Sequence, residues 1–140
     1  MSTVFEHIIV PVDGSEFALK AAKKGLVLAD ILGVPIIAIY VLNPQRFAVD
    51  AEIMTSLKVL LENKAHDYLE EVKALAKDVN CSISTRIIIG IPSEEIISAA
   101  GVNDLIILGH KGQTGLSRVF VGNISEKVLH HAKCSVMIVR

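Results

Sequence analysis

Residues 105–126 read LIILGHKGQTGLSRVFVGNISE and place three patterns in a row. The apolar run 105–108 predicts a buried strand, and the glycine-rich stretch after it predicts a loop. Ile124, Val128 and Leu129 then recur at helical spacing, which predicts a helix. Asn123 is expected to cap that helix, with Glu126 in the capping-box position.

A glycine-rich loop that leads into a helix N-terminus is suited to bind an anion. Glycines let the backbone approach a phosphate, and the free amides and dipole of the helix start favour negative charge. The spacing of Gly109, Gly112 and Gly115 matches neither the dinucleotide fingerprint G-x-G-x-x-G nor a P-loop. The composition of the loop by itself therefore leaves phosphate binding and a plain turn both open.

Strand and helix patterns alternate along the whole chain. Strands are predicted at 7–12, 34–42, 82–89, 105–108 and 134–139. Helices are predicted from Ser15 to Gly33, over 50–79, from Ser93 to about residue 100, and from Asn123 to about residue 131. Ser15 and Ser93 are expected N-caps, and the long helix over 50–79 is expected to kink or to lose its first turn. Such alternation requires parallel strands and right-handed crossovers, so the predicted fold class is α/β, a doubly wound, Rossmann-like sheet with helices on both faces.

Length and composition are those of one domain over 1–140. Hydrophobic residues make up 51% of the chain and there is no tryptophan, which favours an aliphatic core. The formal net charge of −1 offers no basic face for nucleic acid. The longest apolar run, 34–42, contains Pro35 and is too short to span a bilayer. The N-terminus has no pattern of a signal peptide, so a cytoplasmic location is expected.

Cysteines and histidines do not form a recognisable chemical motif. Cys81 and Cys134 are too few for a metal site or a disulfide framework and are expected to be reduced. His66 is expected at the helix surface, and His130 and His131 are best explained as cations near a helix C-terminus. No direct metal ligand is predicted.

The glycine spacing identifies a resemblance. Gly109-x2-Gly112-x9-Gly122 resembles the nucleotide-binding signature of the universal stress protein family, G-x2-G-x9-G-S/T. The similarity extends over the chain through residues 10–15, 90–96, 104–109 and 135–139. One position departs from the signature, because Asn123 stands where the family has Ser or Thr.

The resemblance implies an adenine-nucleotide site. It implies a sheet of the adenine-nucleotide alpha-hydrolase-like type with strand order 3-2-1-4-5, in which Asp13 and the Gly109 loop meet at the topological switch point. Adenine and ribose would lie against Pro11, Val12, Asp13, Val41, Leu108 and Gly109. His110 belongs to the same cofactor-binding set, and the phosphates would pass Gly112 and end at Gly122, Asn123, Ile124 and Ser125. The implied ligand is ATP, or ADP or AMP, with Mg²⁺ or Mn²⁺ held through the phosphates.

Several of these residues also have a plainer interpretation. Asp13 is either a ligand of the nucleotide or the residue that holds its turn, and Val41 is otherwise an ordinary core valine. Asn123 offers an amide donor in place of the family's hydroxyl donor. Ser125 either supplies the missing hydroxyl or simply favours the helix start.

Three functional hypotheses remain from the sequence. The first, which we favour, is a nucleotide-binding stress-response or signalling module. The second is a nucleotide-free dimeric interaction protein of the same family, and the third is an enzyme of adenylyl or phosphoryl transfer. No catalytic residue is predicted, because no general base or arginine–lysine–metal set can be assembled, so ATP hydrolysis is expected to be slow at most. Family members pair through the last strand, so a homodimer through 134–139 is expected, while the protein partner stays unidentified.

Overall fold

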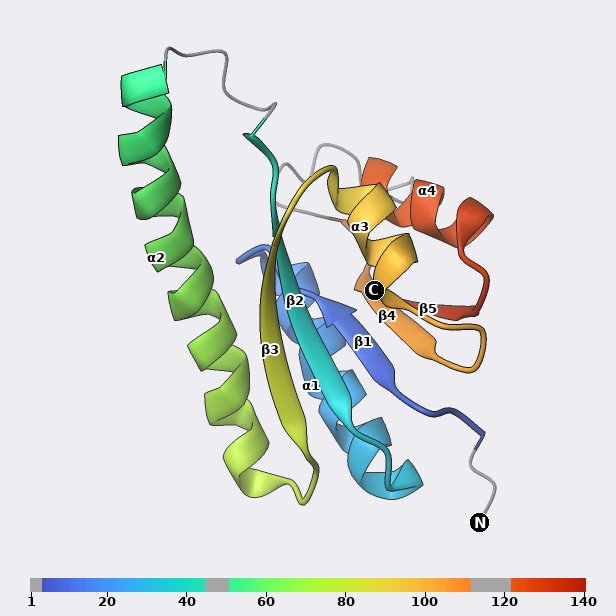
Figure 1. The fold of residues 1–140 in the computed structure, drawn as a ribbon. Coiled ribbons are helices and arrows are strands. Elements are labelled where there is room, and N and C mark those ends of the chain that lie inside the picture. Colours follow the sequence, from blue (N-terminus) through green and yellow to red (C-terminus); the bar gives the residue numbers. More distant parts are fainter. Residues whose placement is uncertain (1–3, 45–50, 112–121) are drawn as a thin grey trace.

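Five parallel strands alternate with four α-helices in the computed structural model, which describes residues 4–44, 51–111 and 122–140 (Figure 1). The elements are β1 (Ile8–Pro11), α1 (Glu16–Leu32), β2 (Ile36–Leu42), α2 (Ala51–Leu75), β3 (Ile83–Ile89), α3 (Pro92–Ala99), β4 (Leu105–Gly109), α4 (Asn123–His131) and β5 (Ser135–Val139). A short 3₁₀ turn, Ala76–Asp78, continues α2. Each strand overlaps its prediction, with bounds shifted by one or two residues. None of the helices in the described ranges is long and apolar enough to cross a membrane.

The sheet has the order β3-β2-β1-β4-β5, with every pair of neighbours parallel, which confirms the expected topology. Strand β1 lies at the centre, where Ile8 is opposite Ile36 of β2 on one side and Leu105 of β4 on the other. Side chains on both faces of β1 and β4 are buried, which explains why these strands are continuously apolar in sequence. Strands β3 and β5 form the two edges of the sheet.

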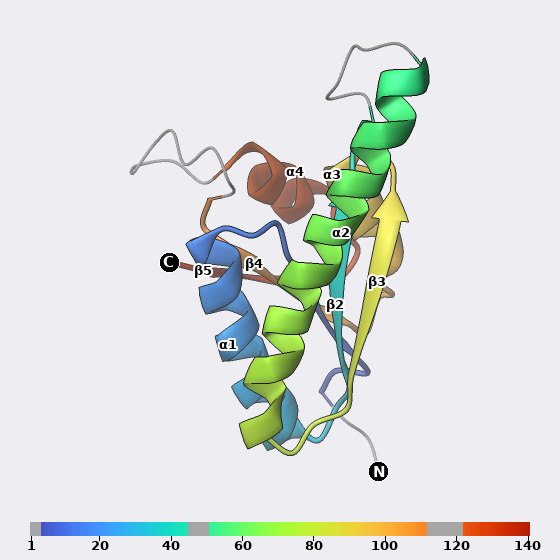
Figure 2. The same cartoon turned by 90° about the vertical axis from the view of Figure 1, so that its left-hand side faces the viewer.

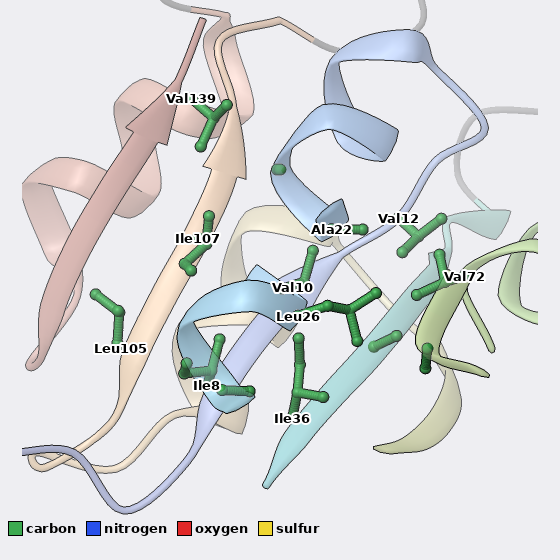
Figure 3. Packing of buried hydrophobic residues seen from close by; sticks show 14 of the residues in the cluster. Ile8, Val10, Val12, Ala22, Leu26, Ile36, Val72, Leu105, Ile107 and Val139 are labelled. Carbon is green, nitrogen blue, oxygen red and sulfur yellow. The ribbon is translucent and has the colours of Figure 1, made fainter. Parts of the chain in front are cut away.

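Two helices cover each face of the sheet (Figures 1 and 2). Helices α1 and α2 pack on the face that carries Ile8, Val10 and Ile107, and Figure 3 shows this larger core. Helices α3 and α4 cover the other face, where Ile9 and Ile106 are buried. Each fully buried aliphatic side chain of this kind contributes roughly 1.5–3 kcal/mol of transfer free energy.

Helix α2 is buried along only part of its length. Its C-terminal half buries Leu69 and Val72 against the sheet. The N-terminal turns project beyond the carboxyl ends of β2 and β3 (Figure 2), and the apolar side chains of Ile53 and Leu60 are more than half exposed there. In the sequence, Ile53 and Leu60 recur at the same helical spacing as Leu69 and Val72, but this spacing cannot show how far the sheet extends beneath the helix.

Helix caps were predicted with mixed success. Ser15 caps α1 by accepting a hydrogen bond from the Ala18 amide at 3.1 Å, and Gly33 ends the same helix with φ of 68°, both as expected. The prediction that Ser93 caps α3 is wrong, because Ile91 is the N-cap and Ser93 is buried inside the first turn. Pro92 takes the first helical position, where its missing N–H costs nothing, and this moves the helix start toward the N-terminus.

The predicted roles of the cysteines agree with the structure. Cys81 and Cys134 precede strands at opposite edges of the sheet, and both are free thiols. Burial raises the pKa of each thiol, and the negative charges of Asp30 near Cys81 and Asp104 near Cys134 raise it further. Raised pKa values keep these thiols protonated at neutral pH, which makes them poor nucleophiles.

Candidate functional site

The strand order brings two distant segments of the chain together at the carboxyl ends of the central strands. Strand β1 pairs with β4, so the turn after Pro11 and the segment after Leu108 lie at the carboxyl ends of neighbouring central strands. The chain leaves β1 toward β2 and reaches β4 on the opposite side, which makes this point the topological switch of the sheet. Open α/β sheets bind their ligands in this crevice.

The turn between β1 and α1 is held by its own polar side chains. Asp13 Oδ1 accepts a hydrogen bond from the Ser15 amide at 2.9 Å, and Ser15 in turn caps α1. Gly14 between them has φ of 86°, a backbone conformation that other residues rarely adopt. The turn-holding role of Asp13 is therefore confirmed, and the half-buried Asp13 lies at the carboxyl end of β1.

The predicted adenine-contacting residues divide between the two faces of the sheet. Val41 and Leu108 belong to the core under α3 and α4, and strand alternation places Pro11 on the same face as Ile9. Val12 is 94% buried in the opposite core, and its amide donates to the Ile39 carbonyl at 2.7 Å. The side chain of Val12 is thus engaged in packing, whereas Pro11, Val41 and Leu108 share the α3–α4 face.

Gly109 ends β4 at a point of close backbone approach. A Cβ atom at this position would lie 2.6 Å from the carbonyl carbon of Phe17, 2.7 Å from its oxygen and 2.9 Å from the Ala18 amide nitrogen. This glycine is therefore required by the packing of α1 against β4, a role that its place in the signature did not reveal.

The start of α4 differs from the prediction. Gly122 is the N-cap, with φ of −60° and ψ of 157°, and Asn123 is the first helical residue, so the predicted Asn123 cap and its Glu126 capping box are wrong. The helix start is set by contacts with the end of β4. The Gly122 amide donates to the His110 carbonyl at 2.8 Å, and the buried Ser125 hydroxyl donates to the Gly109 carbonyl at 2.9 Å.

These hydrogen bonds define which groups at the helix start remain for a ligand. The Ser125 hydroxyl is used within the protein, which supports its structural interpretation, and the Gly122 amide has the His110 carbonyl as its partner. The amides of Asn123, Ile124 and Ser125 lie in the first turn, where no intrahelical acceptor exists. Asn123 and Ile124 are exposed. The first turn of α4 therefore presents three amides of the kind that accept an anion at a helix N-terminus.

Other predicted residues lie at the edge of this region. His110 is buried, and its amide donates to the Val139 carbonyl of β5 at 2.8 Å, which continues the sheet by one residue. The neighbouring Lys111 is also buried. Gly112 lies outside the described residues, as does Gly115.

A shallow groove of about 270 Å³ borders the turn after β1. It is lined by Val12, Gly14, Ser15, Glu16, Leu19, Tyr68 and Glu71. Ligand sites for molecules of drug size are usually larger, about 300–1,000 Å³. Because Glu16 and Glu71 line the groove, it does not suit a triphosphate.

A second cluster of ligating side chains lies at the opposite end of the sheet. In the described parts of the chain, Glu6, His7 and Asp104 have ligand atoms within 4.8 Å of one another. Asp104 accepts from the Gly101 amide at 2.7 Å, and its other carboxylate oxygen lies 3.0 Å from His7 Nδ1. These contacts join the segment before β1 to the turn before β4, a structural role that does not involve the crevice.

Comparisons with known proteins agree on one family. The model of the universal stress protein family matches residues 5–140. A universal stress protein of Methanocaldococcus jannaschii, MJ0531, is 33% identical over 98% of this chain and 83% of its own length.

Solved structures show the same arrangement. The universal stress protein UspA from Lactobacillus plantarum superposes with a TM-score of 0.88 at 26% identity, covering 97% of this chain and 98% of that one. A universal stress protein from Archaeoglobus fulgidus, solved in complex with dAMP, superposes with a TM-score of 0.66 at 16% identity over 98% and 99% of the two chains. At that identity the second structure shows a common fold.

Proposed function

This chain belongs to the universal stress protein family, and from that membership and the geometry of the crevice we propose that it binds an adenine nucleotide, ATP in the first place. The observation that carries the proposal is the attachment of α4 to β4. Two hydrogen bonds, from Gly122 to His110 and from Ser125 to Gly109, hold the helix N-terminus beside the strand that neighbours Asp13.

Each part of the nucleotide has a counterpart in this geometry. Phosphate oxygens would accept from the first-turn amides of α4, with the exposed Asn123 side chain as a further donor. The base would lie near Val41 and Leu108, and the Asp13 carboxylate would accept from a ribose hydroxyl. A Mg²⁺ or Mn²⁺ ion would be held by the phosphates and water. The dAMP complex of the Archaeoglobus fulgidus protein supports an adenine nucleotide as the ligand class.

The proposed role is that of a binding module for stress response or signalling, in which the nucleotide selects a conformation or a partner. Because ATP is supplied inside cells, the proposed place of action is the cytoplasm. One observation favours a second candidate, a nucleotide-free interaction protein. The Gly122 amide is already paired with the His110 carbonyl, which removes one donor from the phosphate end.

Replacing Gly122 with valine is expected to weaken Mg·ATP binding at least tenfold, about 1.4 kcal/mol. The new side chain would stand at the N-cap, where the terminal phosphate approaches the helix. Gly122 has an extended backbone that valine adopts, so the fold is expected to survive. Titration calorimetry with Mg·ATP measures the affinity, and mass spectrometry of the denatured wild type identifies any nucleotide that copurifies.

Gly101→Val is the matched control for this variant. Gly101 lies at the opposite end of the sheet, where a Cβ atom would meet Asp104 Oδ2 at an ordinary 3.5 Å. Its ATP affinity should equal that of the wild type. A wild type that releases no nucleotide and gives no heat at millimolar ATP would contradict the proposal and favour the nucleotide-free candidate.

We also propose that the chain forms a homodimer through the edge strand β5. The Val139 carbonyl accepts from His110 on the β4 side, so strand alternation turns the backbone groups of Val136 and Ile138 away from β4. An edge with apolar side chains and outward-facing backbone groups is suited to pair with a second copy.

Val136→Pro is expected to convert the dimer to a monomer, because proline removes an outward N–H without touching the β4–β5 ladder. Light scattering coupled to size-exclusion chromatography measures the mass. Thr85→Pro is the matched control on the other edge. The Ser82 carbonyl accepts from Ile36 of β2, so Thr85, three residues on, faces away from β2, and this variant should stay dimeric. A monomeric wild type at micromolar concentration would disprove the dimer.

A further inference from the structure

The turn that carries Asp13 rests on an aromatic ring from a distant helix. Tyr68 belongs to α2, and a Cβ atom added to Gly14 would lie 2.7 Å from both its Cε1 and its Cε2 atoms. Two equal distances place the ring symmetrically beneath the glycine, at the phenol end. Only a residue without a side chain allows the ring to come this close.

The ring of Tyr68 also packs against a second aromatic ring. It stacks on Tyr40 of β2, with ring centroids 6.1 Å apart and ring planes inclined by 29°. The next residues of α2 on the sheet side, Leu69 and Val72, are buried, so the helix that carries the ring is anchored to the core. Through its contact with Gly14, the Tyr68 ring therefore fixes the β1–α1 turn relative to α2 and the core.

Movement of Gly14 would move the Asp13 carboxylate. Asp13 and Ser15 flank the glycine, and the hydrogen bond from the Ser15 amide to Asp13 Oδ1 closes the turn around it. The groove of about 270 Å³ beside the ring offers space into which the turn can relax if the ring is removed.

We propose that Tyr68 is a positioning residue for nucleotide binding: its ring holds the Gly14 turn so that the Asp13 carboxylate meets the ribose of the bound adenine nucleotide. This inference rests on the proposed nucleotide-binding function and assigns to α2 a part in it. Tyr68 does not contact the ligand; it acts through Gly14 and Asp13.

Tyr68→Leu tests the proposal, with Tyr68→Phe as the conservative variant. Leucine removes the flat ring and is expected to weaken Mg·ATP binding about tenfold, whereas phenylalanine keeps the ring and should bind as the wild type does. A second measurement needs no nucleotide. Hydrogen exchange of the Ser15 amide, followed by NMR relative to the amides of β1, should be at least tenfold faster in Tyr68→Leu and unchanged in Tyr68→Phe.

Val72→Ala controls for a general loss of stability, because Val72 is buried on the same helix. The atoms nearest to a Cβ at Gly14 belong to Tyr68 and not to Val72, so this variant leaves the contact with the turn intact. It should change neither the ATP affinity nor the relative Ser15 exchange. Unchanged Ser15 exchange in Tyr68→Leu, or equal effects in Val72→Ala, would overturn the positioning role. If the wild type binds no nucleotide, the proposed function fails and with it the binding role of Tyr68, while accelerated Ser15 exchange would still show that the ring holds the turn.

Discussion

Gly109→Ala is expected to lower the free energy of unfolding by about 3 kcal/mol, because a single methyl group would collide with backbone atoms. The new Cβ would lie 2.6 Å from the Phe17 carbonyl carbon and 2.9 Å from the Ala18 amide nitrogen. If the colliding atoms belonged to a flexible side chain, that side chain could rotate away. They are backbone atoms in the first turn of α1, so they cannot. The helix would have to move off β4, and the Asp13 turn at its start would move with it.

Urea unfolding, followed by circular dichroism, measures this loss. Gly101→Ala is the matched control, since its Cβ meets Asp104 Oδ2 at 3.5 Å and leaves the fold unstrained. It should change the free energy of unfolding by less than about 1 kcal/mol. Because the Ser125 hydroxyl donates to the Gly109 carbonyl, the Gly109 variant is also expected to lose ATP affinity. A Gly109→Ala protein as stable as the control would show that α1 does not pack on β4 as described.

Gly14→Ala is expected to cost a similar amount, about 3 kcal/mol, from two separate causes. The φ of 86° disfavours any residue with a side chain by roughly 1–2 kcal/mol. The remainder arises because the new methyl group would contact the Tyr68 ring, 2.7 Å from Cε1 and Cε2. The same urea titration measures the sum.

Two further variants separate these causes. Gly33 also has a positive φ, of 68°, but no atom within 4 Å of the position of its Cβ, so Gly33→Ala should show the backbone cost alone. In a double-mutant cycle, Tyr68→Leu should relieve most of the contact cost of Gly14→Ala. Additive effects of the two substitutions would mean that the ring does not restrict the turn.

The order and type of the secondary-structure elements were predictable because they depend on local patterns. Short apolar runs between turn residues, alternating with amphipathic segments, allow few arrangements other than parallel strands with helical crossovers. The strand order was predictable from the family resemblance, which the glycine spacing carried. Helical spacing alone did not show which apolar residues of α2 are buried, because burial of Ile53 and Leu60 depends on the length of the neighbouring strands.

In the candidate site too, the residues fixed by local contacts could be predicted and those fixed by tertiary contacts could not. The turn role of Asp13 and the cap at Ser15 could be predicted because both are made within three residues of sequence. The start of α4 could not, because Gly122 and Ser125 are bound to the end of β4 rather than capped locally. A cap prediction considers only neighbours in sequence and therefore selected Asn123.

Local sequence thus sufficed for the fold class and the element order, and the family resemblance supplied the strand order that brings Asp13 and Gly109 to the switch point. Tertiary packing alone established why Gly109 and Gly14 are glycines, since Phe17 and Tyr68 press against them from α1 and α2. It likewise directed Val12 into one core and Val41 into the other, and it engaged the Ser125 hydroxyl within the protein. The physical reason is range: turns and helices are stabilised by contacts a few residues apart, whereas these positions are constrained by atoms that only the folded chain brings near.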